Sequence, residues 1–390
     1  MKVGFVVGRF PQLSETFVAH QVKATLEHGS EVTVVCEGVC ALPATDLSSA
    51  GRPLADFAED WWGPLGALRA SLARLPHRLS DKIMTGLDTL ALPRLRRQDV
   101  VVAHFGYNGL RVARLIKRGL MRCPLITVYH GYDVGVPYAE NGLGIYKELF
   151  KHGHLHLTVN EHFRRLLIEA GAPEDRTFVH HMGVNLEEIP FLERNFSDSP
   201  FLFVSVSRLT QKKGIEFALR ALAILKSERP DILWHYNIVG DGPLLTQLCE
   251  LRDTLGLDEQ VTFEGSQSHA RVKDILATAH IFLLPSVTAS NGDVEGIPVA
   301  IMEAMASGLV VVSTIHSGIP EIVQDGLTGF LTQERDPEAL FSAFLRVFQN
   351  TDALNEIAKR AREKVESDFN NIKQDKKFFQ YLVNSKNYFQ

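Results

Sequence analysis

Apolar residues along this chain gather in short continuous runs, and stretches of helical periodicity separate them. Continuous apolar runs of about four to eight residues are typical of strands that are buried on both faces of a parallel sheet. In the first half such runs occupy residues 3–7, 31–36, 100–104, 125–129 and 156–158. Helical periodicity alternates with them at residues 15–28, 110–119 and 161–170. This alternation predicts a Rossmann-like domain of parallel strands and crossover helices.

The second half repeats the alternation. Between the halves, residues 179–200 lose periodicity and contain Pro190 and Pro200, which indicates a linker. The later strands are predicted at residues 201–206, 234–239, 261–264, 281–284 and 310–313. Helices are predicted between them, for example at residues 214–227 and 243–255. We therefore predict an α/β protein with Rossmann-like domains at residues 1–190 and 191–368, followed by a C-terminal helix at residues 369–390.

The composition agrees with this interpretation. A chain of 390 residues is long enough for two domains, and 45% apolar with 22% charged residues is typical of a soluble protein. No apolar run approaches the roughly 18 residues of a membrane span. The N-terminus reads as a strand and not as a signal peptide. The cysteines show no metal-binding spacing, so a reducing cytoplasm is the expected compartment.

The net charge of −5 is unevenly distributed along the chain. Residues 1–190 carry +1 and residues 191–390 carry −6. Residues 61–98 hold seven basic and two acidic residues, and residues 108–122 hold five basic and no acidic ones. The five are Arg111, Arg114, Lys117, Arg118 and Arg122. We expect both regions of the first domain to contact an anionic membrane surface; the alternative is ordinary solvated helix faces.

Two glutamates eight positions apart, Glu295 and Glu303, bracket a predicted helix start. Glu295 lies on a loop after the strand at 281–284, and Glu303 lies more than a turn inside the helix that Gly308 ends. A pair at this spacing is frequent by chance, so the pattern gains weight only from its place at a strand end. The free backbone N–H groups at the helix start, with carboxylates on both sides, suit a nucleotide-sugar.

Cations follow the strand at residues 201–206. Arg208 and Lys213 are placed to neutralise the two phosphates of a departing nucleoside diphosphate, and arginine adds bidentate geometry. Lys212 is expected to matter much less. No acidic pair with the spacing of a divalent-metal site is evident; Asp293 near Glu295 is the nearest approach to one.

Taken together, these motifs resemble the retaining GT-B glycosyltransferases of family 4. The resemblance includes the segment from Glu295 to Glu303 and the turn at residues 317–321. It also includes the segments at residues 207–214, 239–243 and 127–133. Residues 8–17 resemble the subgroup that builds bacterial exopolysaccharides of the colanic-acid type. The resemblance spans roughly residues 1 to 335, although residues 8–11 read Gly-Arg-Phe-Pro where many members have a Gly-Gly turn.

The resemblance implies a GT-B fold, with two Rossmann-like domains facing across a cleft and a C-terminal helix that crosses back to the first domain. It implies a retaining hexosyltransferase that moves a sugar from a nucleotide-sugar. UDP-glucose is the expected donor, and GDP-mannose and UDP-galactose are the alternatives. The implied acceptor is a lipid-linked saccharide of exopolysaccharide biosynthesis. Neither a metal nor another cofactor is expected, and no nucleic acid partner is expected. The expected location is the cytoplasm, with peripheral contact to the inner face of the plasma membrane.

Individual residues take roles from these arguments. We assign catalysis to His130, Glu295, Arg208 and Lys213. We assign nucleotide-sugar binding to Gly8, Arg208, Lys213, Gly240, Gly265, Gly296, Ile297, Val299 and Glu303. We assign acceptor binding to Arg9, Ser14, Glu15 and Asp133. A single histidine is usually structural, but His130 follows the strand at residues 125–129, where parallel sheets bind ligands. It is expected to contact the sugar, and Glu303 the ribose.

Other activities are compatible with parts of this pattern. A GT-B-fold sugar-nucleotide epimerase or a phosphorylase would share the fold, and so would a non-catalytic scaffold. A dehydrogenase is disfavoured because residues 4–8 do not form a GxGxxG motif. A hydrolase would place both carboxyls around one bond, whereas this pair is divided between ribose and sugar. Release of UDP that depends on an acceptor distinguishes a transferase from these alternatives.

Overall fold

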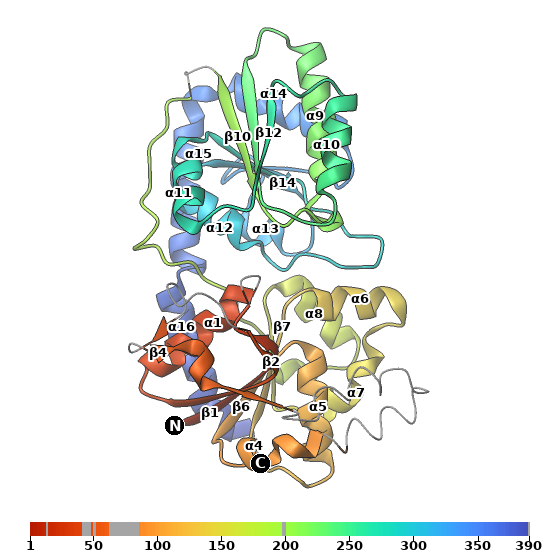
Figure 1. Ribbon diagram of the computed structural model, residues 1–390, viewed down its shortest axis with the longest axis vertical. Helices are drawn as coiled ribbons and strands as arrows, with labels where there is room; N and C mark the ends of the chain where they lie inside the picture. Colours follow the sequence, from red (N-terminus) through yellow and green to blue (C-terminus); the bar gives the residue numbers. More distant parts are fainter. Residues whose placement is uncertain are drawn as a thin grey trace. The chain divides into compact units, whose positions relative to one another are not determined.

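A computed structural model describes residues 1–12, 15–40, 48–49, 52–61, 86, 88–196 and 200–388. The chain forms two compact units (Figure 1). Unit 1 comprises Met1–His180 together with Asp375–Gln390, and unit 2 comprises His181–Gln374. Each unit is built on one parallel sheet, which confirms the predicted pair of Rossmann-like domains.

The main sheet of unit 1 has seven strands within the described ranges, in the order β5-β2-β1-β6-β7-β8-β9, all parallel. These strands are β1 (Lys2–Phe10), β2 (Glu31–Val39), β5 (Ala58–Asp60), β6 (Val100–His104), β7 (Leu125–Tyr129), β8 (Leu155–Thr158) and β9 (Thr177–Val179). The α-helices are α1 (Thr16–Glu27), α4 (Leu92–Leu95), α5 (Gly106–Lys117), α6 (Tyr132–Glu140), α7 (Lys147–His152) and α8 (Glu161–Glu169). A short antiparallel pair, β3 (Ser48–Ser49) and β4 (Arg52–Pro53), stands apart from the main sheet.

The first two strands are longer than their apolar runs predicted. They stay paired beyond Val7, with Arg9 opposite Gly38 and Phe10 opposite Val39. Main-chain hydrogen bonds between neighbours extend a strand regardless of side-chain polarity, so hydrophobic pattern alone ends it too early. Gly8 therefore lies inside β1 and not in the loop that follows it.

The sheet of unit 2 has six parallel strands in its described part, in the order β12-β11-β10-β13-β14-β15. They are β10 (Phe201–Val206), β11 (Trp234–Val239), β12 (Val261–Gly265), β13 (Ile281–Leu284), β14 (Val310–Thr314) and β15 (Phe330–Thr332). The helices are α9 (Ile215–Glu228), α10 (Leu245–Thr254), α11 (His269–Thr278), α12 (Val299–Ala306), α13 (Ile319–Ile322), α14 (Pro337–Gln349) and α15 (Thr351–Asp368).

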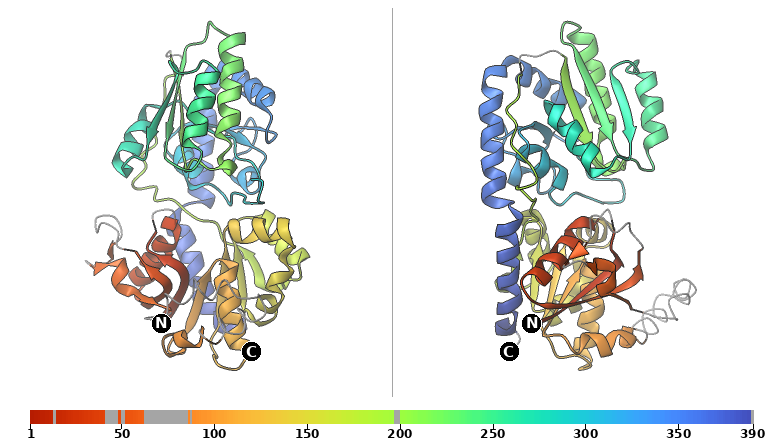
Figure 2. Two further views of the ribbon diagram at one scale, coloured as in Figure 1. Left: turned by 45° about the vertical axis from the view of Figure 1, so that its right-hand side comes forward. Right: turned by 60° about the vertical axis from the view of Figure 1, so that its left-hand side comes forward.

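Helices cover both faces of the unit 2 sheet. Helices α9, α10 and α14 pack together on one face, and α12 and α15 pack together on the other. Figure 2 shows α9 in green and α15 in blue on opposite sides of the strands. Fully buried Phe203, Leu283 and Val312 lie in the core on one face. Burial of each such side chain contributes roughly 1.5–3 kcal/mol, which makes the sheet a rigid support for the loops at its ends.

Each sheet has one topological switch point, where the strand order reverses. In unit 1 it lies between β1 and β6, and in unit 2 between β10 and β13 (Figure 1). Loops that leave the carboxyl ends of strands at such a point diverge to opposite faces and leave room for a ligand. We therefore expect a ligand-binding site to involve the residues that follow β6, β7, β10 and β13.

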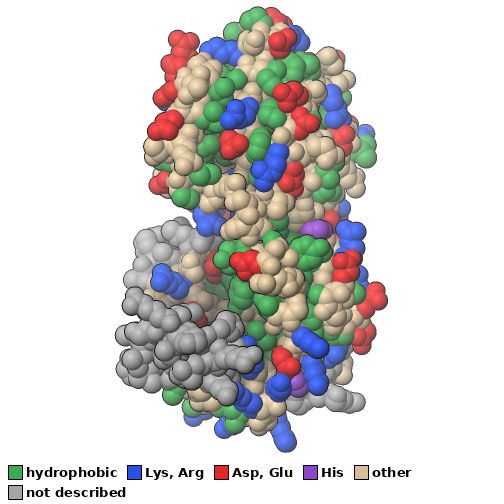
Figure 3. Space-filling view, turned by 90° about the vertical axis from the view of Figure 1, so that its right-hand side faces the viewer, with side chains coloured by type: hydrophobic (Ala, Val, Ile, Leu, Met, Phe, Trp, Pro, Cys, Tyr) green, Lys and Arg blue, Asp and Glu red, His purple; other side chains and the backbone are tan. Residues whose placement is uncertain are grey.

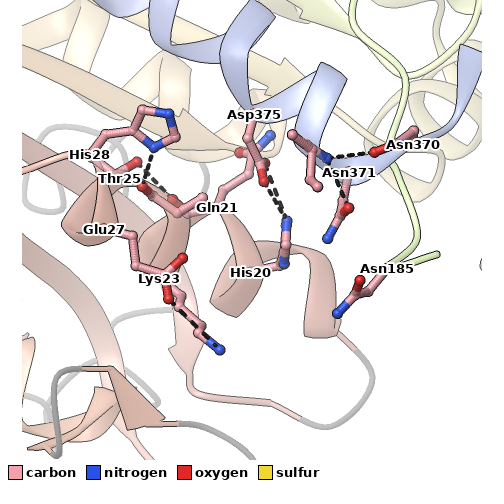
Figure 4. A network of polar contacts seen from close by, with 12 residues as sticks. His20, Gln21, Lys23, Thr25, Glu27, His28, Asn185, Asn370, Asn371 and Asp375 are labelled. Carbon is pink, nitrogen blue, oxygen red and sulfur yellow. Dashed lines mark hydrogen bonds and ion pairs between the residues drawn. The ribbon is translucent and has the colours of Figure 1, made fainter. Parts of the chain in front are cut away.

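The C-terminal helix α16 (Asn371–Asn384) begins in unit 2 and continues into unit 1 from Asp375 onwards. Within unit 1, Asp375 Oδ2 lies 3.0 Å from His20 Nε2 (Figure 4). Phe378 and Leu382 join the same core as β1 and β2. This confirms the C-terminal helix that returns to the first domain.

Candidate active site

The loops after β10 and β13 meet at the switch point of unit 2. The first loop carries Lys213 and the second carries Glu295, and Lys213 Nζ lies 2.9 Å from Glu295 Oε1. Only 14% of the lysine side chain and 9% of the glutamate side chain are exposed. Two residues that the sequence predicts to be catalytic are thus brought into direct contact.

Two glycines with positive φ let loops at this edge of the sheet approach one another closely. A Cβ at Gly214 (φ 65°) would lie 1.9 Å from the carbonyl oxygen of Pro285, in the loop after β13. A Cβ at Gly240 (φ 129°) would lie 1.9 Å from the carbonyl oxygen of Ser207. The Gly240 N–H donates to the carbonyl of Gly265, at the end of β12. Gly240 and Gly265 thus shape neighbouring strand ends, and their contact with a nucleotide-sugar stays a prediction.

The charge of Glu295 follows from its neighbours. Burial by itself raises the pKa of this carboxyl, but Lys213 and Lys212 outweigh it, with a smaller contribution from His316, and lower the pKa to about 2. Glu295 is therefore ionised near neutral pH. Its contact with Lys213 is an ion pair in a partly desolvated place, where electrostatic attraction is stronger than in water.

Lys212 has a larger structural role than sequence analysis assigned to it. Its Nζ lies 3.1 Å from Asp293 Oδ1, donates to the carbonyl of Val294 at 3.4 Å and lies 3.9 Å from Glu295 Oε1. The side chain is 12% exposed. Lys212 fastens the loop after β13 to the loop after β10, while Lys213 holds the carboxylate itself. Asp293, the nearest approach to a metal ligand in the sequence, is a partner of this lysine.

His316 holds the backbone of Glu295 in place. The sequence analysis did not identify this histidine. The Glu295 N–H donates to His316 Nε2 at 3.0 Å, and His316 Nδ1 lies 2.5 Å from Glu334 Oε1. Because Nε2 accepts this hydrogen bond, the ring proton lies on Nδ1, which donates a hydrogen bond to Glu334. Glu334 also accepts from the Thr288 N–H. The place of His316 just after β14 was the available signal, by the same strand-end rule that selected His130.

Helix α12 follows the Glu295 loop as predicted. Pro298 is its N-cap, and Gly308 (φ 91°) lies just past its end. Gly296 and Ile297 directly precede the cap, and Val299 is the first helical residue, whose N–H has no acceptor within the helix. Binding of an anion by these groups stays a prediction.

Glu303 lies one turn further along α12. In the described part of the chain, its carboxylate has no hydrogen bond or ion pair with another side chain. Burial raises its pKa, and the more distant charges of His269 and Lys273 oppose this only in part. An ionised, partly buried carboxylate without a partner carries a desolvation free energy in the free protein. Hydrogen bonds from the hydroxyls of a ligand would offset that free energy.

Arg208 contrasts with the two lysines. It is exposed, and its guanidinium contacts no carboxylate among the residues that the structure describes. Lys212 and Lys213 are matched by Asp293 and Glu295, so the loop after β10 presents one additional positive charge. The switch point of unit 2 therefore suits an anion.

Buried Arg194 caps the far end of α12, and sequence analysis did not find it. Its guanidinium donates to four backbone carbonyls at distances of 2.8–3.1 Å. The acceptors are the carbonyls of Leu276, Ala277, Ser307 and Gly308, at the C-terminal ends of α11 and α12. A cation at a helix C-terminus is stabilising, so Arg194 holds the helix that carries Glu303.

In unit 1, His130 follows β7, beside the switch point, as predicted. Its Nε2 lies 3.0 Å from Nδ1 of His104, the last residue of β6. Burial, together with His104 and His180, lowers the pKa of His130 well below its usual value, so the imidazole is neutral. Sequence analysis missed His104, although it ends a predicted strand just as His130 follows one.

Asp133 has a different role from the expected contact with the acceptor. It is fully buried, and its carboxylate accepts hydrogen bonds from the N–H groups of Gly106, His130 and Gly131 at 2.7, 3.0 and 3.1 Å. The first lies after β6 and the other two after β7. Asp133 joins these two turns and orients the backbone of His130, and it leaves no oxygen exposed to an acceptor.

The other predicted acceptor residues cluster near the end of β1. Arg9 is exposed in the last part of this strand, and Glu15 is the N-cap of α1. Ser14 lies outside the described residues. A Cβ at Gly8 would meet nothing within 4 Å, so packing does not require glycine there. The binding roles of these residues stay predictions.

The expected membrane contact of Arg111 is wrong. Its guanidinium lies 2.8 Å from Asp88 Oδ1, 2.6 Å from Glu37 Oε1 and 3.9 Å from the centre of the Trp61 ring. Trp61, the start of the other expected contact region, is fully buried beneath it. An arginine at this helical spacing can point into the protein when buried carboxylates are available to pair with it. A count of charges along the sequence does not reveal such pairing. Residues 62–85 and 87 of that region lie outside the described residues.

Cations that remain exposed lie near the end of α5 and just before β6. They are Arg96, Arg97, Arg118 and Arg122. Lys117 is exposed as well but pairs with Glu148 at 2.6 Å. Figure 3 shows Lys and Arg side chains gathered toward the lower end of unit 1. Within the described ranges, no helix combines the length and apolar character that crossing a membrane requires.

Two Rossmann-like units, each built on one parallel sheet, give the chain the GT-B fold of the glycosyltransferases that it resembles in structure. Comparison with known families agrees. The chain belongs to the glycosyl transferases of group 1: that family matches residues 189–364, and the glycosyl transferase 4-like domain matches residues 14–183.

Relatives match nearly the whole chain. WcaL of Escherichia coli (strain K12), a glycosyltransferase assigned to colanic acid biosynthesis, is 36% identical over 95% of this chain and 96% of its own. The amylovoran biosynthesis glycosyltransferase AmsK of Erwinia amylovora is 32% identical over the same shares. HepE of Anabaena, solved in complex with UDP and glucose, shares the fold: TM-score 0.75, 20% identity, 98% of this chain and 100% of that one.

Proposed function

We propose that the protein transfers a hexose from UDP-glucose to a lipid-linked saccharide in exopolysaccharide biosynthesis, with retention of the anomeric configuration. Membership of the glycosyl transferases of group 1 supports glycosyl transfer. Relatives that act in colanic acid and amylovoran biosynthesis support the pathway. The likeness to HepE, which has been solved with UDP-glucose, supports the fold, and UDP-glucose is our choice of donor for the first test.

The observation that carries the proposal is the cationic switch point of unit 2. Arg208 is an exposed cation, and Lys213 is held in position by Glu295 at 2.9 Å. Departure of a nucleoside diphosphate develops negative charge on its β-phosphate, and preorganised cations stabilise that charge without rearrangement. Lys213 keeps N–H donors for a phosphate while one of them faces Glu295. The N-terminal end of α12 adds backbone donors on the side of Val299.

The two glutamates then contact different parts of the nucleotide-sugar. Glu303 accepts from the ribose hydroxyls, and these bonds compensate the desolvation of its unpaired carboxylate. Glu295, held by Lys213 and by its backbone bond to His316, lies toward the sugar. His130, a neutral imidazole, bonds a sugar hydroxyl. For retention without a carboxylate nucleophile we propose front-face attack, with the leaving phosphate accepting the proton of the acceptor hydroxyl.

Two further elements complete the proposal. The cations at Arg208 and Lys213 neutralise the diphosphate, so we propose that transfer needs no metal. We also propose that the enzyme works in the cytoplasm, peripherally on the inner face of the plasma membrane, where a lipid-linked acceptor is displayed. Arg96, Arg97, Arg118 and Arg122 are the candidates for contact with anionic lipid.

A sugar-nucleotide epimerase remains the alternative from the same fold. The relatives reported above are glycosyltransferases, so the comparisons give the epimerase no support. An epimerase would convert the nucleotide-sugar without an acceptor, whereas a transferase releases UDP only when an acceptor is present.

A panel of nucleotide-sugars tests the proposal in two stages. A thermal-shift assay first identifies the donor, because a ligand at 100 times its Kd stabilises the folded protein by roughly 2.7 kcal/mol. UDP release is then measured with and without a membrane extract that contains lipid-linked saccharides. Release that depends on the extract and survives EDTA supports the proposal. Acceptor-independent conversion, or complete loss with EDTA that Mg²⁺ or Mn²⁺ restores, contradicts it.

A further inference from the structure

Two imidazoles lie together at the carboxyl edge of the unit 1 sheet. His104 ends β6, which borders the switch point, and His130 follows the neighbouring strand β7. Their Nδ1 and Nε2 atoms are 3.0 Å apart, and their rings stack at a centroid distance of 5.3 Å with an interplanar angle of 16°. This is a direct hydrogen bond between two histidines.

The surroundings hold both rings in place. The Phe5 ring stacks on His104 at 6.0 Å, and the Phe17 ring lies 4.3 Å from His130 and 6.4 Å from His104. Phe105, which has a positive φ of 69°, brings its ring to 4.8 Å from His130. Asp133 fixes the backbone of His130 through its N–H. Neither imidazole is therefore free to flip its nitrogen atoms.

The two rings differ in what their second nitrogen meets. His104 is fully buried, and its Nε2 has no hydrogen-bond partner among the described residues. His130 is only partly buried, and its Nδ1 has no partner in the described part of the chain. The free nitrogen of His104 is thus enclosed in the core, whereas His130 has a nitrogen without a protein partner at the carboxyl edge of the unit 1 sheet.

Only two proton arrangements satisfy the bond between neutral rings. If His130 Nε2 donates, the proton of His104 sits on its buried Nε2 as an N–H without an acceptor. If His104 Nδ1 donates, that Nε2 is an unprotonated acceptor, and His130 carries its proton on Nδ1. Buried N–H groups without a partner are rarer in proteins than unfilled acceptors. Burial also lowers the pKa of His104 to about 3, so a doubly protonated ring is disfavoured.

We propose that His104 is a positioning residue that holds His130 in the tautomer with its proton on Nδ1, so that His130 donates a hydrogen bond to a hydroxyl oxygen of the transferred sugar. This inference rests on the proposed function for the identity of the ligand, and on the contact between the two rings for the tautomer. It explains why a second histidine lies behind the first. A free imidazole would divide its proton between both nitrogens and present a donor only part of the time.

The tautomer is measured directly on the unmodified enzyme. Protein labelled with ¹⁵N-histidine is examined at neutral pH by two-bond ¹H–¹⁵N correlation spectra, which separate the two neutral tautomers and the cation. The His130 signals are assigned by their loss in His130→Asn. A neutral ring protonated on Nδ1 supports the proposal. A ring protonated on Nε2, or a cation, overturns it.

Variants then test the role of His104. His104→Phe keeps a ring between Phe5 and Phe17 but removes the donor, and His104→Asn keeps an N–H on the atom bonded to Cγ. We expect His104→Phe to shift the His130 tautomer and to raise the KM for the nucleotide-sugar on the order of tenfold, the effect of one ordinary hydrogen bond. His104→Asn should stay near wild type in both. An unchanged His130 tautomer in His104→Phe overturns the proposal.

A matched control separates this role from simple loss of core packing. His156 is also fully buried, within the strand β8 that neighbours β7, and it bonds Tyr129 in place of His130. His156→Phe should leave the His130 tautomer and the KM unchanged; a tenfold rise in KM there would overturn a specific role for His104. If no nucleotide-sugar is turned over at all, the proposed function fails, while the spectra still decide the tautomer.

Discussion

The ammonium nitrogen of Lys213 lies 2.9 Å from Oε1 of Glu295, so an ion pair joins the loops that leave the two strands of the switch point in unit 2. The carboxylate holds the lysine in place before any ligand arrives, and the lysine keeps the carboxylate ionised. This mutual support means that the two residues should respond differently when each is removed.

Removal of the glutamate charge should separate binding from transfer. In Glu295→Gln, Lys213 and Lys212 lose a competing anion, so we expect UDP to bind at least as tightly as to the wild type. Transfer should fall by on the order of a hundredfold, because we propose that Glu295 lies toward the transferred sugar. Calorimetry with UDP and steady-state rates provide the measurements. A variant that no longer binds UDP would contradict this division.

Removal of the cations should reduce kcat. Arg208→Ala and Lys213→Ala should each lower kcat by on the order of a hundredfold, since each removes a charge that we propose stabilises the leaving diphosphate. Lys212→Met should lower kcat much less. It should instead destabilise the fold by roughly 1 kcal/mol, because its partner Asp293 remains partly exposed. Equal losses of kcat at Lys212 and Lys213 would show that the phosphate contacts are misassigned.

Glu303 should show opposite effects on stability and on binding. Its folded-state pKa is raised by burial, so the native protein holds this proton more tightly than the unfolded chain and loses stability as pH rises through that pKa. Glu303→Gln should therefore raise the Tm at neutral pH and remove this part of the pH dependence, while it weakens UDP binding by about tenfold. A lower Tm at neutral pH would indicate a carboxylate partner and would argue against the ribose role.

Arg194 should matter for stability far more than its single charge suggests. Arg194→Met removes the donor from four backbone carbonyls at the ends of α11 and α12, so we expect a loss on the order of 3 kcal/mol in urea unfolding. Arg220→Met, on the exposed face of α9, serves as the control and should stay within about 0.5 kcal/mol of the wild type.

Membrane contact should depend on the exposed cations of unit 1. The double variant Arg118→Glu with Arg122→Glu should lose affinity for anionic liposomes, and the wild-type affinity should fall as salt screens the charges. Arg220→Glu in unit 2 is the matched control. Equal binding of the wild type to neutral and anionic liposomes at low salt would identify these arginines as ordinary solvated side chains.

The pattern along the chain predicted most of the parallel strands and the helix that carries Glu303, because a strand buried on both faces needs a continuous apolar run. Three short strands at the edges of the sheets, β5, β9 and β15, escaped prediction. The strand-end rule found Arg208, Lys213, Glu295 and His130 and could have found His104 and His316, had it been applied to every strand.

By itself, the sequence determined the two-domain α/β class, the family resemblance and the strand ends on which chemistry was expected. Only the tertiary structure decided which charges meet. It paired Lys213 with Glu295 and Lys212 with Asp293, turned Arg111 inwards onto Trp61 and enclosed Asp133 among backbone N–H groups. The physical reason is that periodicity reports which face of an element is buried, whereas contacts between loops far apart in sequence depend on strand order and on the glycines that let those loops approach.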